Sequence, residues 1–186
     1  MDFYKSTTLS PELNKYYQAI TRIVDNVSVP QGETKLLDHL YLGSLDEAED
    51  VNKLQNLGIT HVINTVHNQT APTTRHVYGG TFEYLGFTSV DDKRYDIMHH
   101  FTSVFEFIER ARKWGGKCFI HCLAGINRSG VLATAYVMIH KDCGPITAVK
   151  YVHEKRGILL SNHGFIEALI LLAYERGMLE KDKDII

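Results

Sequence analysis

Residues 117–130 read KCFIHCLAGINRSG, and they join a predicted strand to a predicted helix through a loop of small and apolar residues. Residues 117–121 predict a short apolar strand that ends at His121. The apolar residues 130–140 predict a helix. In an α/β protein this order places the loop at the carboxyl edge of the sheet, which is where such proteins bind their ligands.

This loop has the features of an anion-binding site. Its backbone N–H groups converge as the chain enters the helix, and the positive end of the helix dipole lies there. Cys122 lies at the start of the loop, where these dipoles stabilise a thiolate. Arg128 lies at the helix end, where a guanidinium can bind two oxygens of one phosphate group. The segment therefore predicts a site for a tetrahedral phosphate beside a thiolate.

Predicted strands and helices alternate on both sides of this segment. Besides 117–121, strands are predicted at 59–66 and 81–87, and a strand or strand pair at 36–42. Helices are predicted to begin after Ser10 and to cover 44–57, 96–114, 130–140, 146–156 and 163–176. This order predicts an α/β fold with a central, mostly parallel sheet of about five strands and helices on both faces.

Length and composition favour one globular domain. The chain has 186 residues, of which 44% are hydrophobic and 23% charged. We expect the domain at residues 33–180. A helix within residues 1–32 is expected to pack on or beside it, and residues 181–186 are expected to form a polar tail.

Charge and cysteine content exclude several classes of protein. Twenty Lys and Arg against 22 Asp and Glu give a net charge of −2, which argues against nucleic-acid binding. Three cysteines argue against a secreted disulfide scaffold. No apolar run reaches the ~18 residues of a membrane span, and the first residues lack the pattern of a signal peptide. We therefore expect a cytoplasmic protein that does not insert into membranes, with the nucleus as a second compartment.

The pattern His-Cys-x-x-Gly-x-x-Arg-Ser-Gly at 121–130 resembles the phosphate-binding loop of the cysteine-dependent protein phosphatases. The small size and the layout from about residue 34 to 178 resemble the atypical dual-specificity phosphatases. This resemblance implies a protein tyrosine phosphatase-like fold. It also implies hydrolysis of phosphotyrosine, phosphoserine and phosphothreonine through a phosphocysteine, without a cofactor or metal.

The resemblance also implies a role for each residue of the motif. Cys122 is expected to be the nucleophile, and Arg128 to bind the phosphate and stabilise the transferring group. Ser129 is expected to hydrogen-bond the sulfur and help it leave in the second step. His121 is expected to fix the loop backbone, and the Asn162 side chain to brace the loop. The cradle is expected to be lined by the backbone N–H groups of Leu123, Ala124, Gly125, Ile126, Asn127 and Arg128.

A general acid is needed because the phenoxide that leaves phosphotyrosine has a pKa of about 10. Asp91, Asp92 and Asp96 are the candidates. Asp96 precedes a predicted apolar helix face, so we expect it to cap that helix. Spacing in the family assigns the acid to Asp91 and leaves Asp92 as the alternative.

Three other functions compete with a protein phosphatase. A phosphoinositide phosphatase usually carries Lys at the variable loop positions, but these are Leu123, Ala124, Ile126 and Asn127. An RNA 5′-triphosphatase needs more cationic surface than a net charge of −2 suggests. A phosphopeptide-binding pseudophosphatase usually lacks the Cys or the Arg, and both are present.

Phosphorylated proteins are the expected partners, and mitogen-activated protein kinases are a family-level candidate among them. No nucleic acid is expected as a partner. His99 and His100, considered with His61, His67 and His76, have no acidic or cysteine residue at ligand spacing, so no metal site is expected. The sequence leaves the oligomeric state open.

Overall fold

The computed structural model describes residues 9–29, 32–69, 80–181 and 185. The start of the predicted N-terminal segment 1–32 and most of the predicted tail 181–186 lie outside the described residues. Within the described part, no helix is both long enough and apolar enough to span a bilayer.

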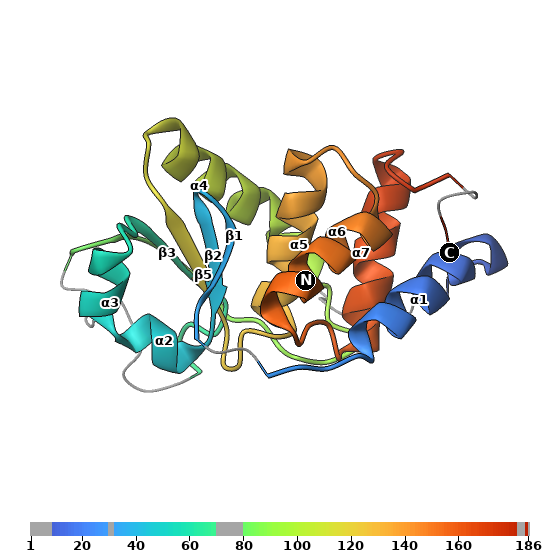
Figure 1. Cartoon of the computed structure of the whole chain (residues 1–186), viewed down its shortest axis with the longest axis horizontal. Coiled ribbons are helices and arrows are strands. Elements are labelled where there is room, and N and C mark those ends of the chain that lie inside the picture. The colour runs from blue at the N-terminus through green and yellow to red at the C-terminus, as the bar shows by residue number, and fades with distance from the viewer. Residues whose placement is uncertain (1–8, 30–31, 70–79, 182–184, 186) are drawn as a thin grey trace.

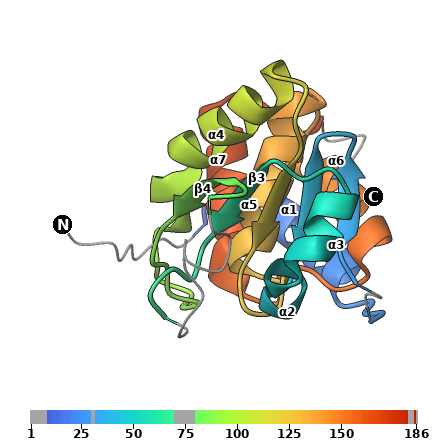
Figure 2. The same cartoon turned by 90° about the vertical axis from the view of Figure 1, so that its left-hand side faces the viewer.

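A five-stranded sheet runs through the molecule in the order β1-β2-β5-β3-β4 (Figures 1 and 2). The strands are β1 (Thr34–Leu37), β2 (Leu40–Gly43), β3 (His61–Asn64), β4 (Glu83–Gly86) and β5 (Cys118–His121). β1 and β2 form an antiparallel hairpin, and the other neighbours pair in parallel. The predicted mostly parallel sheet is therefore confirmed, and residues 36–42 belong to a pair of strands.

Helices cover both faces of this sheet (Figures 1 and 2). They are α1 (Pro11–Val24), α2 (Leu45–Glu49), α3 (Val51–Asn56), α4 (Phe101–Lys113), α5 (Arg128–His140), α6 (Pro145–Arg156) and α7 (His163–Glu175), with a 3-10 helix η1 (Ile97–His100) before α4. α2 and α3 pack on one face, whereas α4, α5 and α6 pack on the other and α7 and α1 lie beyond them. Successive strand residues point to opposite faces, so Val62 joins the smaller core and Ile63 the larger one.

Three helix boundaries differ from the sequence-based expectation. The predicted helix at 44–57 is two helices, because Asp50 accepts a hydrogen bond from the Lys53 N–H (2.9 Å) and so caps α3. The predicted helix at 96–114 begins as η1, and Asp96 makes no side-chain capping hydrogen bond, so its expected capping role is wrong. α5 begins at Arg128 rather than at residue 130.

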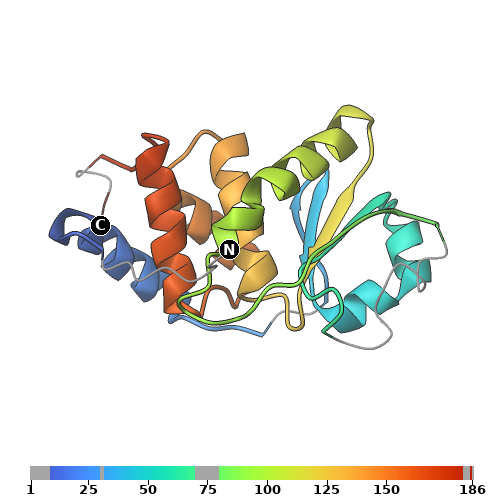
Figure 3. The same cartoon turned by 180° about the vertical axis from the view of Figure 1, so that it is seen from behind.

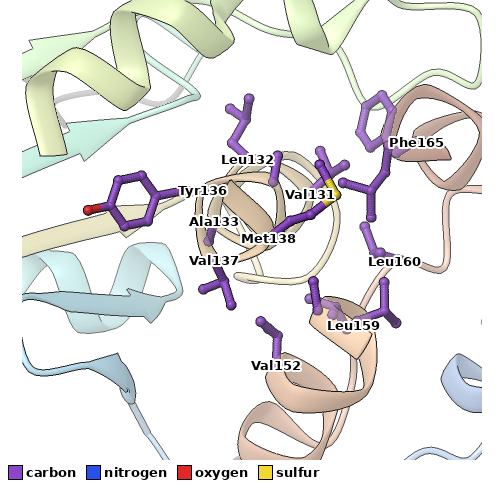
Figure 4. Close-up of a cluster of buried hydrophobic side chains, with 14 of the residues drawn as sticks. Val131, Leu132, Ala133, Tyr136, Val137, Met138, Val152, Leu159, Leu160 and Phe165 are labelled. Atoms are coloured by element: carbon purple, nitrogen blue, oxygen red, sulfur yellow. The ribbon is translucent and has the colours of Figure 1, made fainter. Parts of the chain in front are cut away.

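α5 is buried along its whole length up to Met138. Figure 4 shows its side chains radiating from the helix axis toward its neighbours, with Val152, Leu159 and Phe165 among the contacts. A helix that is apolar on all sides is a core helix rather than a surface one. Its first turn, which begins with Arg128, is therefore held by the centre of the molecule.

α1 packs against α6 and α7 and contributes to the larger core. Ile20, near the middle of its apolar face, is fully buried, whereas Gln18 on the same helix is exposed. We predict that Ile20→Ala lowers the free energy of unfolding by about 2–5 kcal/mol, because it leaves a cavity between α1 and its neighbours. Gln18→Ala should change it by no more than about 0.5 kcal/mol. Urea unfolding measures both, and similar small effects would show that α1 is a separable appendage.

Candidate active site

The loop after β5 lies at the carboxyl edge of the sheet, between the ends of two parallel neighbours. His121 at the end of β5 pairs with Gly43 of β2 on one side and with Asn64 of β3 on the other. The segment between β4 and α4 and the turn before α7 run along the same edge (Figure 3). The topology therefore brings the predicted phosphate loop, the predicted acid and Asn162 to one place.

Cys122 lies at the floor of this loop and is 2% exposed. Its Sγ accepts a hydrogen bond from the Gly125 N–H (3.2 Å) and another from the Ser129 hydroxyl (3.2 Å). Both donors stabilise a negative charge on sulfur. The structure therefore places Ser129 where its expected role requires it.

Gly125 is the position in the loop that no other residue fits. Its φ is +69°, and a Cβ built there would lie 2.5 Å from the Gly43 carbonyl oxygen and 2.6 Å from an Nη of Arg156. The loop therefore packs directly against the end of β2, which allows its backbone to close around a ligand.

Arg156, at the end of α6, braces the loop from behind, and sequence reasoning missed it. Its buried guanidinium donates to the carbonyl oxygens of Gly125 (3.3 Å), Ala124 (3.2 Å) and Gly32 (2.7 Å), and to the Thr34 hydroxyl (3.2 Å). Holding these carbonyls on the outer side leaves the loop N–H groups on the inner side. Burial lowers the pKa of Arg156, and the multiple acceptors offset the cost of burying its charge.

Arg128 is 5% exposed and is fixed along one edge of its guanidinium. One Nη donates to the Gln69 side-chain oxygen (2.9 Å) and to the Ser89 carbonyl oxygen (3.2 Å). Its buried Nε has no hydrogen-bond partner among the described residues. Buried polar atoms in folded proteins nearly always have partners, so this orphaned donor favours an anionic ligand. Gln69 was not identified from the sequence, because it lies 59 residues away.

His121 contacts the loop backbone through its ring. Its Nδ1 lies 3.2 Å from the Cys122 carbonyl oxygen. Burial lowers the pKa of His121 to about 4, so the ring is neutral at pH 7 and Nδ1 donates this hydrogen bond. The arrangement agrees with the role expected from the sequence.

Asp91 and Asp92 point in different directions. Asp91 accepts hydrogen bonds from the side-chain N–H groups of Asn162 (2.7 Å) and Asn127 (3.1 Å), and one of its oxygens lies 4.0 Å from Arg128 Nε. Asp92 instead accepts from the Arg94 backbone N–H (2.8 Å), which lowers its pKa. The geometry therefore places Asp91 beside the phosphate loop, whereas the Asp92 carboxylate is hydrogen-bonded within its own turn.

Asn162 differs in detail from its expected role. Its side chain contacts Asp91 and accepts a hydrogen bond from the Gly164 N–H (3.1 Å), which caps α7. Only its backbone N–H reaches the phosphate loop, where it donates to the Asn127 side-chain oxygen (3.1 Å). The Asn162 side chain is therefore linked to the phosphate loop through Asp91, which also accepts a hydrogen bond from Asn127 of that loop.

Within the described residues, His39, Glu109 and His140 place one possible metal ligand each within 4.8 Å of the others. Arg112 already donates to both oxygens of Glu109 (3.0 and 2.7 Å), and the Tyr136 hydroxyl donates to one of them (2.6 Å). His39 precedes β2, so the cluster lies at the amino end of that strand, away from Cys122. We assign this satisfied cluster a structural role.

Comparison with known proteins places this geometry among phosphatases. Residues 40–176 match the family described as "Dual specificity phosphatase, catalytic domain". The mouse protein "Dual specificity protein phosphatase 26" is 39% identical over 134 residues, which are 72% of this chain and 63% of that relative. The chain thus spans less than two thirds of that relative.

Two solved structures show the same fold. DUSP15 is 32% identical and superposes with a TM-score of 0.70 over 78% of this chain and 89% of its own. The human tyrosine phosphatase-like serine/threonine/tyrosine-interacting protein is 30% identical, with a TM-score of 0.68 over 78% of this chain and 96% of its own. These likenesses support the predicted protein tyrosine phosphatase-like fold.

The buried His121 predicts a pH-dependent stability. The unfolded chain binds a proton at this residue below its ordinary pKa of 6.5, whereas the folded chain does so only near pH 4. Stability is therefore present above pH 6.5 and is lost as the pH falls toward 4, by on the order of 3 kcal/mol from this residue. His121→Asn keeps a donor for the Cys122 carbonyl oxygen but does not titrate.

Urea unfolding between pH 7 and pH 4 should show a smaller loss of stability in His121→Asn than in the wild type. The other histidines contribute equally to both proteins, so the difference isolates His121. Parallel curves would contradict a neutral, buried imidazole at this position.

Proposed function

The chain belongs to the dual-specificity phosphatase family, and from that premise we propose that it hydrolyses phosphate monoesters on tyrosine, serine and threonine side chains of proteins. One observation carries the proposal. Cys122 Sγ accepts two hydrogen bonds at the floor of a loop whose Arg128 keeps a buried donor without a hydrogen-bond partner among the described residues. A stabilised sulfur nucleophile beside a cation that keeps one donor free for a ligand suits attack on a phosphate group.

In the first step the Cys122 thiolate attacks phosphorus. A sulfur–phosphorus bond forms as the bond between phosphorus and the leaving oxygen breaks. Asp91 gives its proton to that oxygen, which leaves as a neutral hydroxyl group. Arg128 and the loop N–H groups bind the remaining phosphate oxygens and stabilise the charge on the transferring group.

In the second step water hydrolyses the phosphocysteine. The Asp91 carboxylate takes a proton from the water as its oxygen attacks phosphorus, and the sulfur leaves as a thiolate. The Ser129 hydroxyl and the Gly125 N–H, each 3.2 Å from Sγ, stabilise that thiolate. Inorganic phosphate is released, and the enzyme returns to its starting state.

The rim of the site suits a side chain of a phosphoprotein. Leu123 and Val90 are 46% and 42% exposed, and each is adjacent in sequence to a reacting residue. Apolar groups at these positions favour the ring of phosphotyrosine over a highly charged head group. Phosphorylated mitogen-activated protein kinases of the cytoplasm and nucleus are the specific substrates that we propose to test.

Cys122→Ser tests covalent catalysis. The variant should retain less than about one per cent of the wild-type turnover of a phosphotyrosine peptide, because losing a nucleophile costs several orders of magnitude. It should still bind inorganic phosphate, since Arg128 and the loop N–H groups remain. Parallel assays with phosphoserine peptide, phosphoinositide and 5′-triphosphorylated RNA distinguish the substrate classes. A wild-type protein that binds phosphopeptide without any turnover would instead be a pseudophosphatase.

Asp91→Asn and Asp92→Asn test the assignment of the general acid. Asp91→Asn should lower kcat on phosphotyrosine by about 10²–10⁴-fold, the usual value of general acid catalysis. The loss should shrink on an aryl phosphate whose leaving group has a low pKa, because that oxygen needs no proton. Asp92→Asn should have a small effect on both substrates. A large loss of kcat in Asp92→Asn that depends on the leaving group would show that Asp92, not Asp91, is the general acid.

A further inference from the structure

We propose that Asn127 is a positioning residue whose side chain holds Asp91 in place for proton transfer. The inference rests on the phosphatase activity proposed above. The Asn127 backbone lies in the phosphate loop, but its side-chain amide points to the acid instead of the sulfur. One residue thereby ties the acid to the group that binds the phosphate.

The Asp91 carboxylate is held by two amides. Asn127 Nδ2 donates to one oxygen (3.1 Å), and Asn162 Nδ2 donates to the other (2.7 Å). Arg128 Nε lies 4.0 Å from the carboxylate, which is too far for a hydrogen bond. The two amides, not the guanidinium, therefore fix the orientation of the acid.

The Asn127 amide is itself fixed in one orientation. Its Oδ1 accepts hydrogen bonds from the Ser161 hydroxyl (3.1 Å) and from the Asn162 backbone N–H (3.1 Å). A backbone N–H can bond only to the oxygen of the amide, so Nδ2 must face Asp91. Asn127 thus joins three segments: the loop that carries Asp91 (the acid loop), the phosphate loop and the turn before α7.

A second contact holds that turn against the phosphate loop. Leu160 donates its backbone N–H to the Ile126 carbonyl oxygen (3.2 Å) and has a φ of +54°. A buried leucine rarely adopts this conformation, and it persists only where the surroundings impose it. The turn therefore provides a rigid support for the Asn127 amide.

The loop that carries Asp91 also borders a cavity. A cavity of about 380 Å³ lies between this loop and α7, lined by Lys93, Asp96 and Glu167 among others. Among the described residues, the side-chain hydrogen bonds to the Asp91 carboxylate come from the amides of Asn127 and Asn162, so these amides determine where it lies. Losing the Asn127 donor frees one oxygen of Asp91, and a displacement of about 1 Å can lower a rate by about 10²-fold.

A double-mutant cycle tests whether Asn127 acts through Asp91. Asn127→Ala should lower kcat on a phosphotyrosine peptide by about 10–100-fold, and much less on an aryl phosphate with a low-pKa leaving group. In the Asp91→Asn background the same substitution should add less than about twofold. Inhibition by inorganic phosphate should change by less than about threefold, because the backbone of the cradle is retained.

Asn127→Asp is the matched variant. It keeps the oxygen that accepts from Ser161 and Asn162 but replaces the donor with an anion facing Asp91. It should lower kcat on phosphotyrosine at least as much as Asn127→Ala does. Asp is nearly isosteric with Asn, so this variant still tests the role of the Asn127 donor if the Asn127→Ala protein does not fold.

Three results would overturn the inference. They are an equal loss in both Asp91 backgrounds, an equal loss on both leaving groups, and normal kinetics in Asn127→Asp. Each of these leaves the proposed activity intact, because the wild type still turns over substrate through Cys122. A wild-type protein with no Cys122-dependent turnover would overturn both proposals together.

Discussion

The site depends on a buried guanidinium that is not part of the phosphate loop. Arg156 lies 31 and 32 residues from Gly125 and Ala124, whose carbonyl oxygens it binds. A peptide unit whose carbonyl is held outward turns its N–H inward, so this contact prepares the loop to bind an anion before any ligand arrives. Preorganised dipoles of this kind stabilise developing charge without reorganising during the reaction.

The site residues that the sequence brings together most directly are those that lie close together in the chain. Cys122, Arg128 and Ser129 occupy one strand–loop–helix unit, so their spacing alone brings them together. Arg156 and Gln69 could not be predicted, because only the tertiary packing brings α6 and the segment after β3 to this loop. Residue spacing predicts the geometry of one strand, loop or helix, whereas contacts between residues far apart in the chain produce no periodic pattern in the sequence.

The two neighbouring aspartates also show that a sequence pattern does not identify the partners that a side chain has in the folded protein. Asp91 and Asp92 have identical side chains in one loop, so residue type does not distinguish them, and the choice of Asp91 rested on spacing in the family. In the structure their partners differ: two amides for Asp91 and the Arg94 backbone for Asp92. The expected capping by Asp96 was wrong for a related reason. Capping preference describes an average helix start, whereas this helix begins with a 3-10 turn that Asp96 does not cap.

The burial of α5 has a consequence for how the protein loses activity. Arg128 and Ser129 form the first turn of a helix that is surrounded by the core, so this helix cannot open without exposing much of that core. Local fluctuations of surface loops can therefore alter access to Cys122 while the phosphate cradle stays intact. Loss of the cradle requires cooperative unfolding, and the amide hydrogens of α5 belong to the last group to exchange with solvent.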